Sequence, residues 1–333
     1  MLTKIIAQAN VDHVEKWFDR AEKLVIVSHV SPDGDAIGSS LGLYHYLVSQ
    51  EKTVHVIVPN AFPDFLRWMP GAKDIIQYNR YKDFADKLIN EADVICVLDL
   101  NALSRLDDMQ EVVRTSPARK MLVDHHLYPE DFAKITISHP NISSTSELVF
   151  RLICRLGGFS DISKEGAECI YTGMMTDTGA FTYNSNNREI YLIISELLSK
   201  GIDKDEIYRK VFNNCSEDRL RLKGYVLCEK MQIFPHLRSA LITLDKSEQG
   251  KFNYMKGDTE GLDCHTLEFY YYMRIMDKDL SVCKNKTDMG EELVWLPIED
   301  IEKSSIKPSF ISERINEIVN GKGTLHIIEE RDR

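Results

Sequence analysis

A short apolar run that leads directly into acids and a histidine constrains this chain more than any other feature. Residues 24–27 read Leu-Val-Ile-Val, which is typical of a buried strand, and residues 41–47 have the apolar spacing of a helix. His29, Asp33 and Asp35 stand between them. A strand, a polar loop and a helix in this order predict an open α/β sheet, in which ligands bind beyond the carboxyl ends of the strands.

The polar loop can bind a metal ion or simply turn the chain. One imidazole and two carboxylates suit Mn²⁺ or Zn²⁺ better than Ca²⁺. Gly34 and Gly38 permit a sharp turn and a close approach to a ligand. Ser39 lies near the expected start of the helix, where an anion is favoured, and we predict it as a substrate contact. The alternative is a Pro-Asp-Gly-Asp turn that only caps the helix.

A second apolar strand, expected within residues 92–98, ends in Asp99. An acid at the end of a buried strand is costly without a charged or metal partner, so Asp99 points to the same crevice. The alternative role is a helix N-cap for the segment that begins at Ala102, and Asn101 could supply that cap equally well. We also predict Asn101 as a substrate contact at this edge.

A third strand, over residues 120–123, is followed by Asp124, His125 and His126. Adjacent side chains diverge in direction, so one histidine can face a metal while the other faces substrate. Further along, Asp177 follows an apolar helix beside Gly179 and can serve as another acidic ligand. Arg188 lies in a polar loop and is available to neutralise a phosphate.

Length and composition limit the class of protein. A chain of 333 residues predicts two domains, and its net charge of −11 argues against binding long nucleic acid through a basic surface. A small anionic substrate remains compatible with this charge if metal ions offset it. Seven cysteines without a Cys-x-x-Cys pair, no signal-peptide pattern and no long apolar stretch predict a cytoplasmic protein that does not bind membranes.

These patterns together predict an α/β fold, a doubly wound, mainly parallel sheet with a second, smaller α+β domain. We place the sheet domain at residues 1–190, a helical linker at 191–230 and the smaller domain at 231–333. Further strands are expected at 53–58 and 135–138, and helices are expected at about 10–22, 145–156, 164–176, 189–200 and 204–214. Ser144 and Glu147 fit a capping box, which gives them a mainly structural role.

The polar residues at the strand ends resemble the four motifs of the DHH phosphoesterases. The motifs correspond to His29-x-x-x-Asp33-x-Asp35, to Asp99, to Asp124-His125-His126 and to Asp177. Within that superfamily the chain is most similar to the nanoRNase A type. Those enzymes are oligoribonucleases that also remove the 3′-phosphate of 3′-phosphoadenosine 5′-phosphate, and some are labelled exopolyphosphatase-related. The resemblance runs from the N-terminus to about residue 262.

The resemblance implies a site with two divalent metal ions, expected to be Mn²⁺, with Mg²⁺, Co²⁺ or Zn²⁺ as alternatives. It implies His29 and Asp33 on one ion, Asp35, His125 and Asp177 on the other, and Asp99 on both. His126 would meet the scissile phosphate and Asp124 would orient the histidine pair. Two neighbouring ions of this kind activate a water and clamp the attacking and leaving oxygens.

The C-terminal part departs from the family pattern. The family's smaller domain, known as DHHA1, carries a Gly-Gly-Gly-His segment, and the nearest glycines here, at 321–326, do not match it. Residues 239–244 fit that domain's first strand. The sequence after about residue 262 resembles the C-terminal part of a Nudix-type domain without that family's metal-binding helix. An α+β lid is the simpler alternative.

The implied function is hydrolysis of short oligoribonucleotides to mononucleotides, together with removal of the 3′-phosphate of phosphoadenosine phosphate. Because the same pair of metals serves several substrates, the alternatives are a cyclic or linear dinucleotide phosphodiesterase and an exopolyphosphatase. An alternative of another class is a nucleotide-binding protein with an impaired substrate domain. The expected partners are short RNA oligonucleotides or small nucleotides, and a homodimer is left open.

Overall fold

The computed structural model describes residues 2–213, 217–234 and 239–242. It divides into two compact units, Met1–Asn214 and Cys215–Arg333. The first unit extends past the domain boundary expected near residue 190, because helices expected in a linker contribute buried side chains to its core. Ile193 and Leu197 come from one of these helices, and Ile207 and Val211 come from the next.

Six parallel strands form the centre of the first unit. They are β1 (Lys23–Val27), β2 (Thr53–Val58), β3 (Ile76–Gln77), β4 (Val94–Leu98), β5 (Arg119–Asp124) and β6 (Ile135–Ser138). Their order across the sheet is β3-β2-β1-β4-β5-β6, and every neighbouring pair is parallel. The chain therefore moves outward from β1 through β2 and β3, then returns to β4 on the other side of β1. This doubly wound topology confirms the expected fold class, and its switch point lies between β1 and β4.

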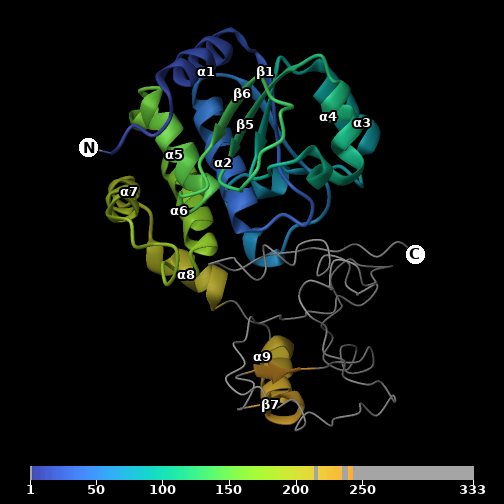
Figure 1. Ribbon diagram of the computed structural model, residues 1–333, viewed down its shortest axis with the longest axis vertical. Coiled ribbons are helices and arrows are strands. Elements are labelled where there is room, and N and C mark those ends of the chain that lie inside the picture. Colours follow the sequence, from blue (N-terminus) through green and yellow to red (C-terminus); the bar gives the residue numbers. More distant parts are fainter. Residues whose placement is uncertain (1, 214–216, 235–238, 243–333) are drawn as a thin grey trace, which may run out of the picture. The chain divides into compact units, whose positions relative to one another are not determined.

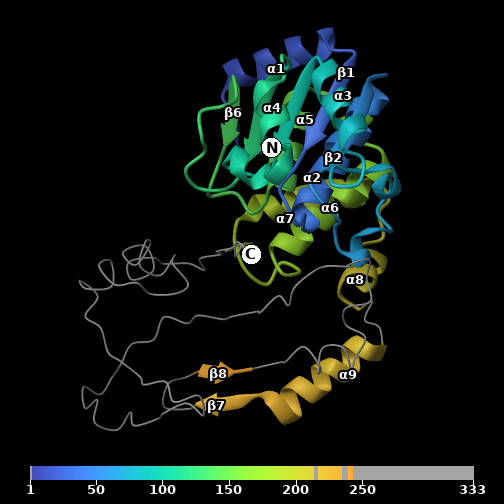
Figure 2. The same cartoon turned by 90° about the vertical axis from the view of Figure 1, so that its right-hand side faces the viewer.

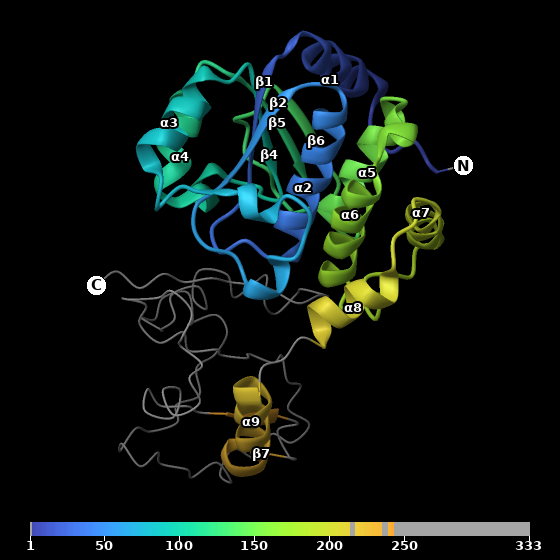
Figure 3. The same ribbon diagram turned by 180° about the vertical axis from the view of Figure 1, so that it is seen from behind.

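Helices cover both faces of the sheet (Figures 1 and 3). The α-helices of this unit are α1 (Gln8–Arg20), α2 (Gly34–Ser49), α3 (Lys82–Glu91), α4 (Gln110–Thr115), α5 (Thr145–Arg155), α6 (Lys164–Asp177), α7 (Arg188–Ser199) and α8 (Lys204–Phe212). Short 3₁₀-helices are η1 (Asp64–Leu66), η2 (Ala72–Asp74), η3 (Leu103–Met109) and η4 (Gly158–Asp161). Alternate residues of β1 serve the two faces: Leu24 and Ile26 pack with α2, whereas Val25 and Val27 pack with α3.

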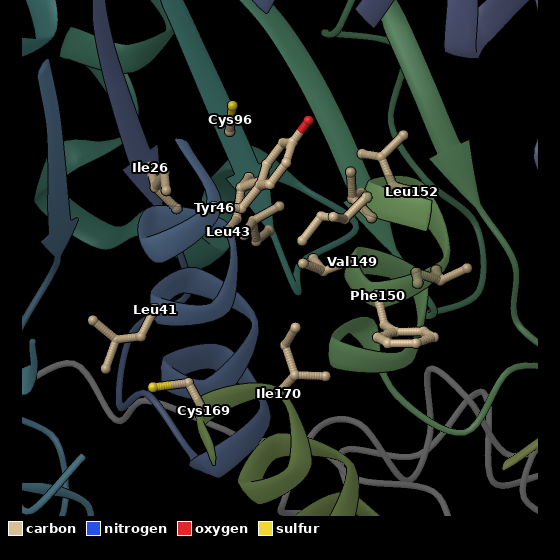
Figure 4. Packing of buried hydrophobic residues seen from close by; sticks show 14 of the residues in the cluster. Ile26, Leu41, Leu43, Tyr46, Cys96, Val149, Phe150, Leu152, Cys169 and Ile170 are labelled. Atoms are coloured by element: carbon tan, nitrogen blue, oxygen red, sulfur yellow. The ribbon is translucent and has the colours of Figure 1, made fainter. Parts of the chain in front are cut away.

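Helix α2 packs closely against α5 and α6. Figure 4 shows Leu43 and Tyr46 of α2 among side chains of α5 and α6, such as Phe150 and Ile170. A Cβ atom at Gly38 would lie 2.7 Å from the backbone carbonyl oxygen of Cys169 on α6, which is too close for any side chain. The backbones of α2 and α6 therefore meet at this glycine, and their polar ends are held at a fixed separation.

The start of α2 corrects the prediction from sequence. The helix begins at Gly34, well before the expected apolar stretch 41–47, with Asp33 as its N-cap. Gly34 and Gly38 are therefore helical and serve helix packing rather than a sharp turn. Most other elements agree with the expected ones: the strands expected at 53–58 and 135–138 are β2 and β6 with the same bounds.

The described part of the second unit holds two helical segments and a small sheet. These elements are α9 (Glu217–Tyr225), the π-helix η5 (Val226–Lys230), β7 (Gln232–Phe234) and β8 (Ser239–Leu241). Strands β7 and β8 pair antiparallel (Figure 2), and β8 begins where the sequence predicts the first strand of a DHHA1-like domain. The atypical stretch after residue 262, including 321–326, lies outside the described residues. Among the described helices, none has the length and apolar composition that crossing a bilayer requires.

Candidate metal centre

The predicted metal ligands gather at the carboxyl ends of the central strands. The loops after β1, β4 and β5 supply some of these side chains, and the ends of helices α2 and α6 supply the others. The six ligands are His29, Asp33, Asp35, Asp99, His125 and Asp177. Their meeting point is the switch point between β1 and β4, where the loops diverge and leave room for a ligand.

One group of ligands consists of His29, Asp33 and Asp99. The Nε2 atom of His29 lies 3.5 Å from Oδ2 of Asp99 and 3.8 Å from Oδ1 of Asp33. One possible ligand atom from each residue lies within 4.8 Å of the others. His29 and Asp99 are buried, whereas the Asp33 side chain is 59% exposed, so this group is open on one side.

A second group consists of Asp35, His125 and Asp177. The Nε2 atom of His125 lies 3.4 Å from Oδ2 of Asp177 and 3.9 Å from Oδ2 of Asp35. The same Nε2 atom lies 3.7 Å from Oδ1 of Asp99, whose other oxygen faces His29. Asp99 therefore stands between the two groups, as a ligand shared by two ions would.

Backbone carbonyls fix how two of the histidines face the carboxylates. The Nδ1 atom of His29 lies 2.8 Å from the carbonyl oxygen of Val30, and Nδ1 of His125 lies 3.3 Å from that of Ile142. A carbonyl only accepts, so each Nδ1 carries a hydrogen and donates it. The Nε2 atoms are then the ones that can bind a metal, and they are the atoms that face the acids.

His126 is held differently from its neighbour. Its Nδ1 atom lies 2.7 Å from Oδ1 of Asp124, which also accepts the His126 backbone N–H at Oδ2. Its Nε2 atom lies 3.3 Å from Nη1 of Arg105. Atoms of Asp99, His125 and His126 also lie close enough to hold an ion, but the guanidinium cation and the bond to Asp124 disfavour His126 as a ligand. The geometry is consistent with the predicted division of roles between the two histidines.

The N-terminus of α5 supports the acids in a way that the sequence analysis missed. The backbone N–H groups of Thr145 and Ser146 donate to the two oxygens of Asp35 at 2.6 and 2.9 Å. The Thr145 hydroxyl donates to Oδ1 of Asp99 at 2.8 Å. Ser144 caps the helix as expected, by accepting from Glu147 N–H. A run of hydroxyl residues at a helix start was the available signal, because free N–H groups there favour an anion.

The electrostatics of the cluster match a cation site. Burial and the charges of Asp99 and Asp33 raise the pKa of Asp177 to about 8. Burial, followed by the charges of Asp99 and Asp177, raises the pKa of Asp35 well above its usual range. Burial would lower the pKa of His29, but its contacts with Asp33 and Asp99 outweigh this and raise the pKa to about 10. In the metal-free chain, bound protons therefore offset the negative charge that divalent ions would neutralise.

Asp99 also has an unusual backbone. Its φ angle is +62°, in the left-handed region that residues other than glycine rarely adopt. Burial would raise the pKa of this carboxyl, but the contact with His29 and the charges of His29 and His125 lower it below its usual range. A strained residue held ionised between two groups of ligands is typical of a functional position. Neither Asp99 nor Asn101 caps the next helix, because the N-cap of η3 is Ala102.

The structure does not bring all of the predicted substrate contacts to the cluster. Ser39 is fully buried inside α2, where its hydroxyl donates to the Ala36 carbonyl, because the helix begins earlier than expected. The side chain of Asn101 donates to the carbonyl of Leu127 and so supports the loop after the histidine pair. Arg188 is exposed at the start of α7 and makes no hydrogen bond or ion pair with any described residue.

Comparison with known proteins gives a consistent result. The family described as "DHH family, N-terminal domain" matches residues 23–174, which include all of the predicted ligands except Asp177. A curated relative, the bifunctional oligoribonuclease and PAP phosphatase NrnA of Thermus thermophilus, is 31% identical over 184 residues. That match covers 55% of this chain and 52% of the relative, so it spans about half of the relative's length. The cyclic-di-AMP phosphodiesterase PdeA of Listeria monocytogenes is 25% identical over 60% of this chain and 31% of its own length.

A solved structure covers more of the chain. The crystal structure of an exopolyphosphatase-related protein from Bacteroides fragilis is 75% identical, with a TM-score of 0.76, and the match covers 78% of this chain and 76% of that one. The family match lies on the sheet unit, and its strand ends carry the residues that resemble the family's motifs. The chain therefore belongs to the DHH family of phosphoesterases.

Proposed function

We propose that this chain hydrolyses phosphate esters with two Mn²⁺ ions. Its substrates would be short oligoribonucleotides, which it converts to mononucleotides, and 3′-phosphoadenosine 5′-phosphate, from which it removes the 3′-phosphate. One observation carries the proposal: Asp99 lies between a His29 group and a His125 group, each of which can hold a metal ion. Relatives such as the Thermus NrnA are bifunctional oligoribonucleases and PAP phosphatases by name, which supports this choice of substrates.

The side chains present fit two divalent ions. Carboxylates and imidazole Nε2 atoms are the donors that Mn²⁺ and related metals accept. His29 and Asp33 would hold one ion, Asp35, His125 and Asp177 the other, and Asp99 both. When bound, the ions supply an activated water and neutralise charge on the phosphate.

Other residues of the centre would position the reacting groups. Asp124 fixes the ring of His126 through Nδ1, so His126 can contact the scissile phosphate. In the hydrolysis, the oxygen of water forms a new bond to phosphorus while the bond to the departing nucleoside oxygen breaks. We propose that Arg188 adds a more distant phosphate contact, since its guanidinium is free of partners in the described chain.

Two findings favour other substrates for the same centre. The Listeria relative is named a cyclic-di-AMP phosphodiesterase, and the Bacteroides structure is that of an exopolyphosphatase-related protein. The fold and the ligand set do not discriminate among these phosphate compounds. A cyclic or linear dinucleotide phosphodiesterase and an exopolyphosphatase are therefore the alternative functions.

A panel assay on the purified full chain tests the proposal. Metal is first removed with EDTA, and Mn²⁺ is then added back with a labelled diribonucleotide, phosphoadenosine phosphate, cyclic di-AMP or polyphosphate. We expect Mn²⁺-dependent release of mononucleotide from the first and of phosphate from the second, and no product with EDTA. Faster turnover of cyclic di-AMP or polyphosphate would favour an alternative function. Binding of Mn²⁺ and nucleotide without any turnover would contradict catalysis and favour a nucleotide-binding role.

A further inference from the structure

Arg105 is a cationic residue beside the centre that no sequence motif singled out. It lies in η3, the short helix that follows Asp99 and β4. Its Nη1 atom lies 3.3 Å from Nε2 of His126, and its backbone carbonyl accepts the N–H of Val30 at 2.8 Å. Val30 directly follows His29, so Arg105 connects the loop after β1 with the loop after β5.

Hydrogen-bond chemistry fixes the direction of these contacts. A guanidinium group only donates, so Nε2 of His126 accepts from Arg105. Nδ1 of His126 must then carry the ring hydrogen that Asp124 accepts at 2.7 Å. The carboxylate thus orients the imidazole, and the imidazole orients the guanidinium. The Nε and Nη2 atoms of Arg105 have no hydrogen-bond partner among the described residues, so most of the guanidinium donors remain available.

The charge of the centre also favours an anion next to Arg105. Within the described part of the chain, five carboxylates lie at the site: Asp33, Asp35, Asp99, Asp124 and Asp177. Two divalent ions would leave one negative charge uncompensated, and the Arg105 cation balances it. An incoming phosphate would then meet a neutral site instead of a negative one, with planar guanidinium donors on the side of His126.

We propose that Arg105 binds the substrate phosphate and favours a terminal phosphate monoester over an internal phosphodiester. The proposal rests on the proposed phosphoesterase function and adds a substrate-binding residue to it. A phosphate monoester carries close to two negative charges at neutral pH, whereas a phosphodiester carries one. A guanidinium that binds phosphate oxygens therefore stabilises the monoester complex more, and this preference depends on the side chain of Arg105.

The test compares Arg105→Ala and Arg105→Lys with the parent chain and a matched control. The bond from Val30 reaches the backbone carbonyl of Arg105, so both variants keep it. The control is Arg114→Ala, which removes an exposed guanidinium on α4 that pairs only loosely with Glu111, at 3.8 Å. For each protein we would measure Mn²⁺ affinity, binding of inorganic phosphate to the Mn²⁺-loaded chain, and kcat/KM for phosphoadenosine phosphate and for a diribonucleotide.

We expect Arg105→Ala to weaken phosphate binding and kcat/KM for phosphoadenosine phosphate by about 10- to 100-fold, with a smaller loss for the diribonucleotide. Arg105→Lys should recover part of the loss, because it restores the charge without the planar donors. Mn²⁺ affinity should stay within about twofold of the parent value in all variants, and Arg114→Ala should match the parent throughout.

The possible failures are distinguishable. If Arg105→Ala binds phosphate and turns over both substrates like an active parent chain, the role of Arg105 is refuted while the proposed function stands. Equal losses for the two substrates would refute the preference for monoesters. A parent chain that loads Mn²⁺ but neither binds phosphate nor turns over substrate would contradict the proposed function itself, and the role of Arg105 with it.

Discussion

The two groups of metal ligands are built in different ways. The His29 group takes Asp33 from the cap of α2, where the side chain is 59% exposed and its Oδ1 atom already accepts two helix N–H groups. The His125 group takes Asp35 from a fully buried position, where the amides of Thr145 and Ser146 hold both oxygens. One group therefore relies on a surface side chain, and the other on the packing of three helices.

This difference predicts two metal sites of unequal character. Ligands that are fixed before the metal arrives lose less conformational freedom on binding. The group of Asp35, His125 and Asp177 should therefore hold its ion more tightly. The group of His29 and Asp33 should exchange its ion more readily, because an exposed carboxylate can turn away into solvent.

Removal of the shared ligand should have the largest effect. Asp99→Asn takes one charged ligand from both groups at once, so we expect a loss of Mn²⁺-dependent turnover beyond the roughly 10- to 100-fold that an outer contact causes. Initial rates with a diribonucleotide and a count of bound Mn²⁺ would measure it. Asp64→Ala, which removes an exposed carboxylate paired with Arg67, is the control. Full activity of Asp99→Asn would refute the shared role of Asp99.

A pair of matched variants tests the inequality directly. Asp33→Asn keeps an oxygen for the helix cap, so its effect reports on metal binding rather than on the loss of the cap. Asp35→Asn removes a charge that two buried N–H groups stabilise, and its NH₂ group cannot accept from them. We expect about 100-fold weaker binding of one Mn²⁺ for Asp35→Asn and about 10-fold for Asp33→Asn. Calorimetric titration with Mn²⁺ measures both, and an equal loss would remove the distinction between the groups.

A substitution in the contact between α2 and α6 should affect the second group less than the loss of a ligand does. A Cβ atom at Gly38 would meet the backbone of α6 at 2.7 Å, whereas one at Gly42 would come close to the side chain of Ile170 and would lie 3.8 Å from the nearest backbone atom, the Gly166 carbonyl oxygen. We expect Gly38→Ala to lower the free energy of unfolding by about 1–3 kcal/mol and Gly42→Ala to lower it less. Because α2 carries Asp35 and α6 carries Asp177, Gly38→Ala should also weaken the tighter Mn²⁺ site. Urea unfolding and Mn²⁺ titration measure the two effects, and equal unfolding free energies for both variants would contradict the close contact.

Sequence reasoning worked where a local pattern determines the structure. Apolar runs that end in acids identified β1, β4 and β5, and parallel strands bring such ends to one edge of the sheet. The positions of Asp99 and His125 in the centre followed from this rule alone. Their roles as metal ligands stay predictions that the variants above would test.

Other features depend on contacts between distant residues, which no local pattern contains. The amide of Thr145 that holds Asp35 lies 110 positions further along the chain. Arg105 meets His126 across 21 positions, and its helix carries no motif. The early start of α2, which buries Ser39, follows from Asp33 acting as the cap while the apolar pattern begins only later.

Proton release on metal binding gives the finest distinction between the two groups. In the metal-free chain, the pKa of His29 is raised to about 10 and that of Asp177 to about 8, so both side chains hold a proton at pH 7. A metal must displace these protons, so Mn²⁺ affinity rises with pH until each pKa is passed.

Mn²⁺ titrations in buffers of different ionisation enthalpy would count the protons released. We expect more protons to be released at pH 7 than at pH 9, under nitrogen, because Asp177 has lost most of its proton at pH 9 while His29 keeps its own. Asp177→Asn should lower the number released at pH 7 and leave it nearly unchanged at pH 9. If the number is the same at both pH values, these pKa values do not separate the two groups, and the contrast between them rests on rigidity alone.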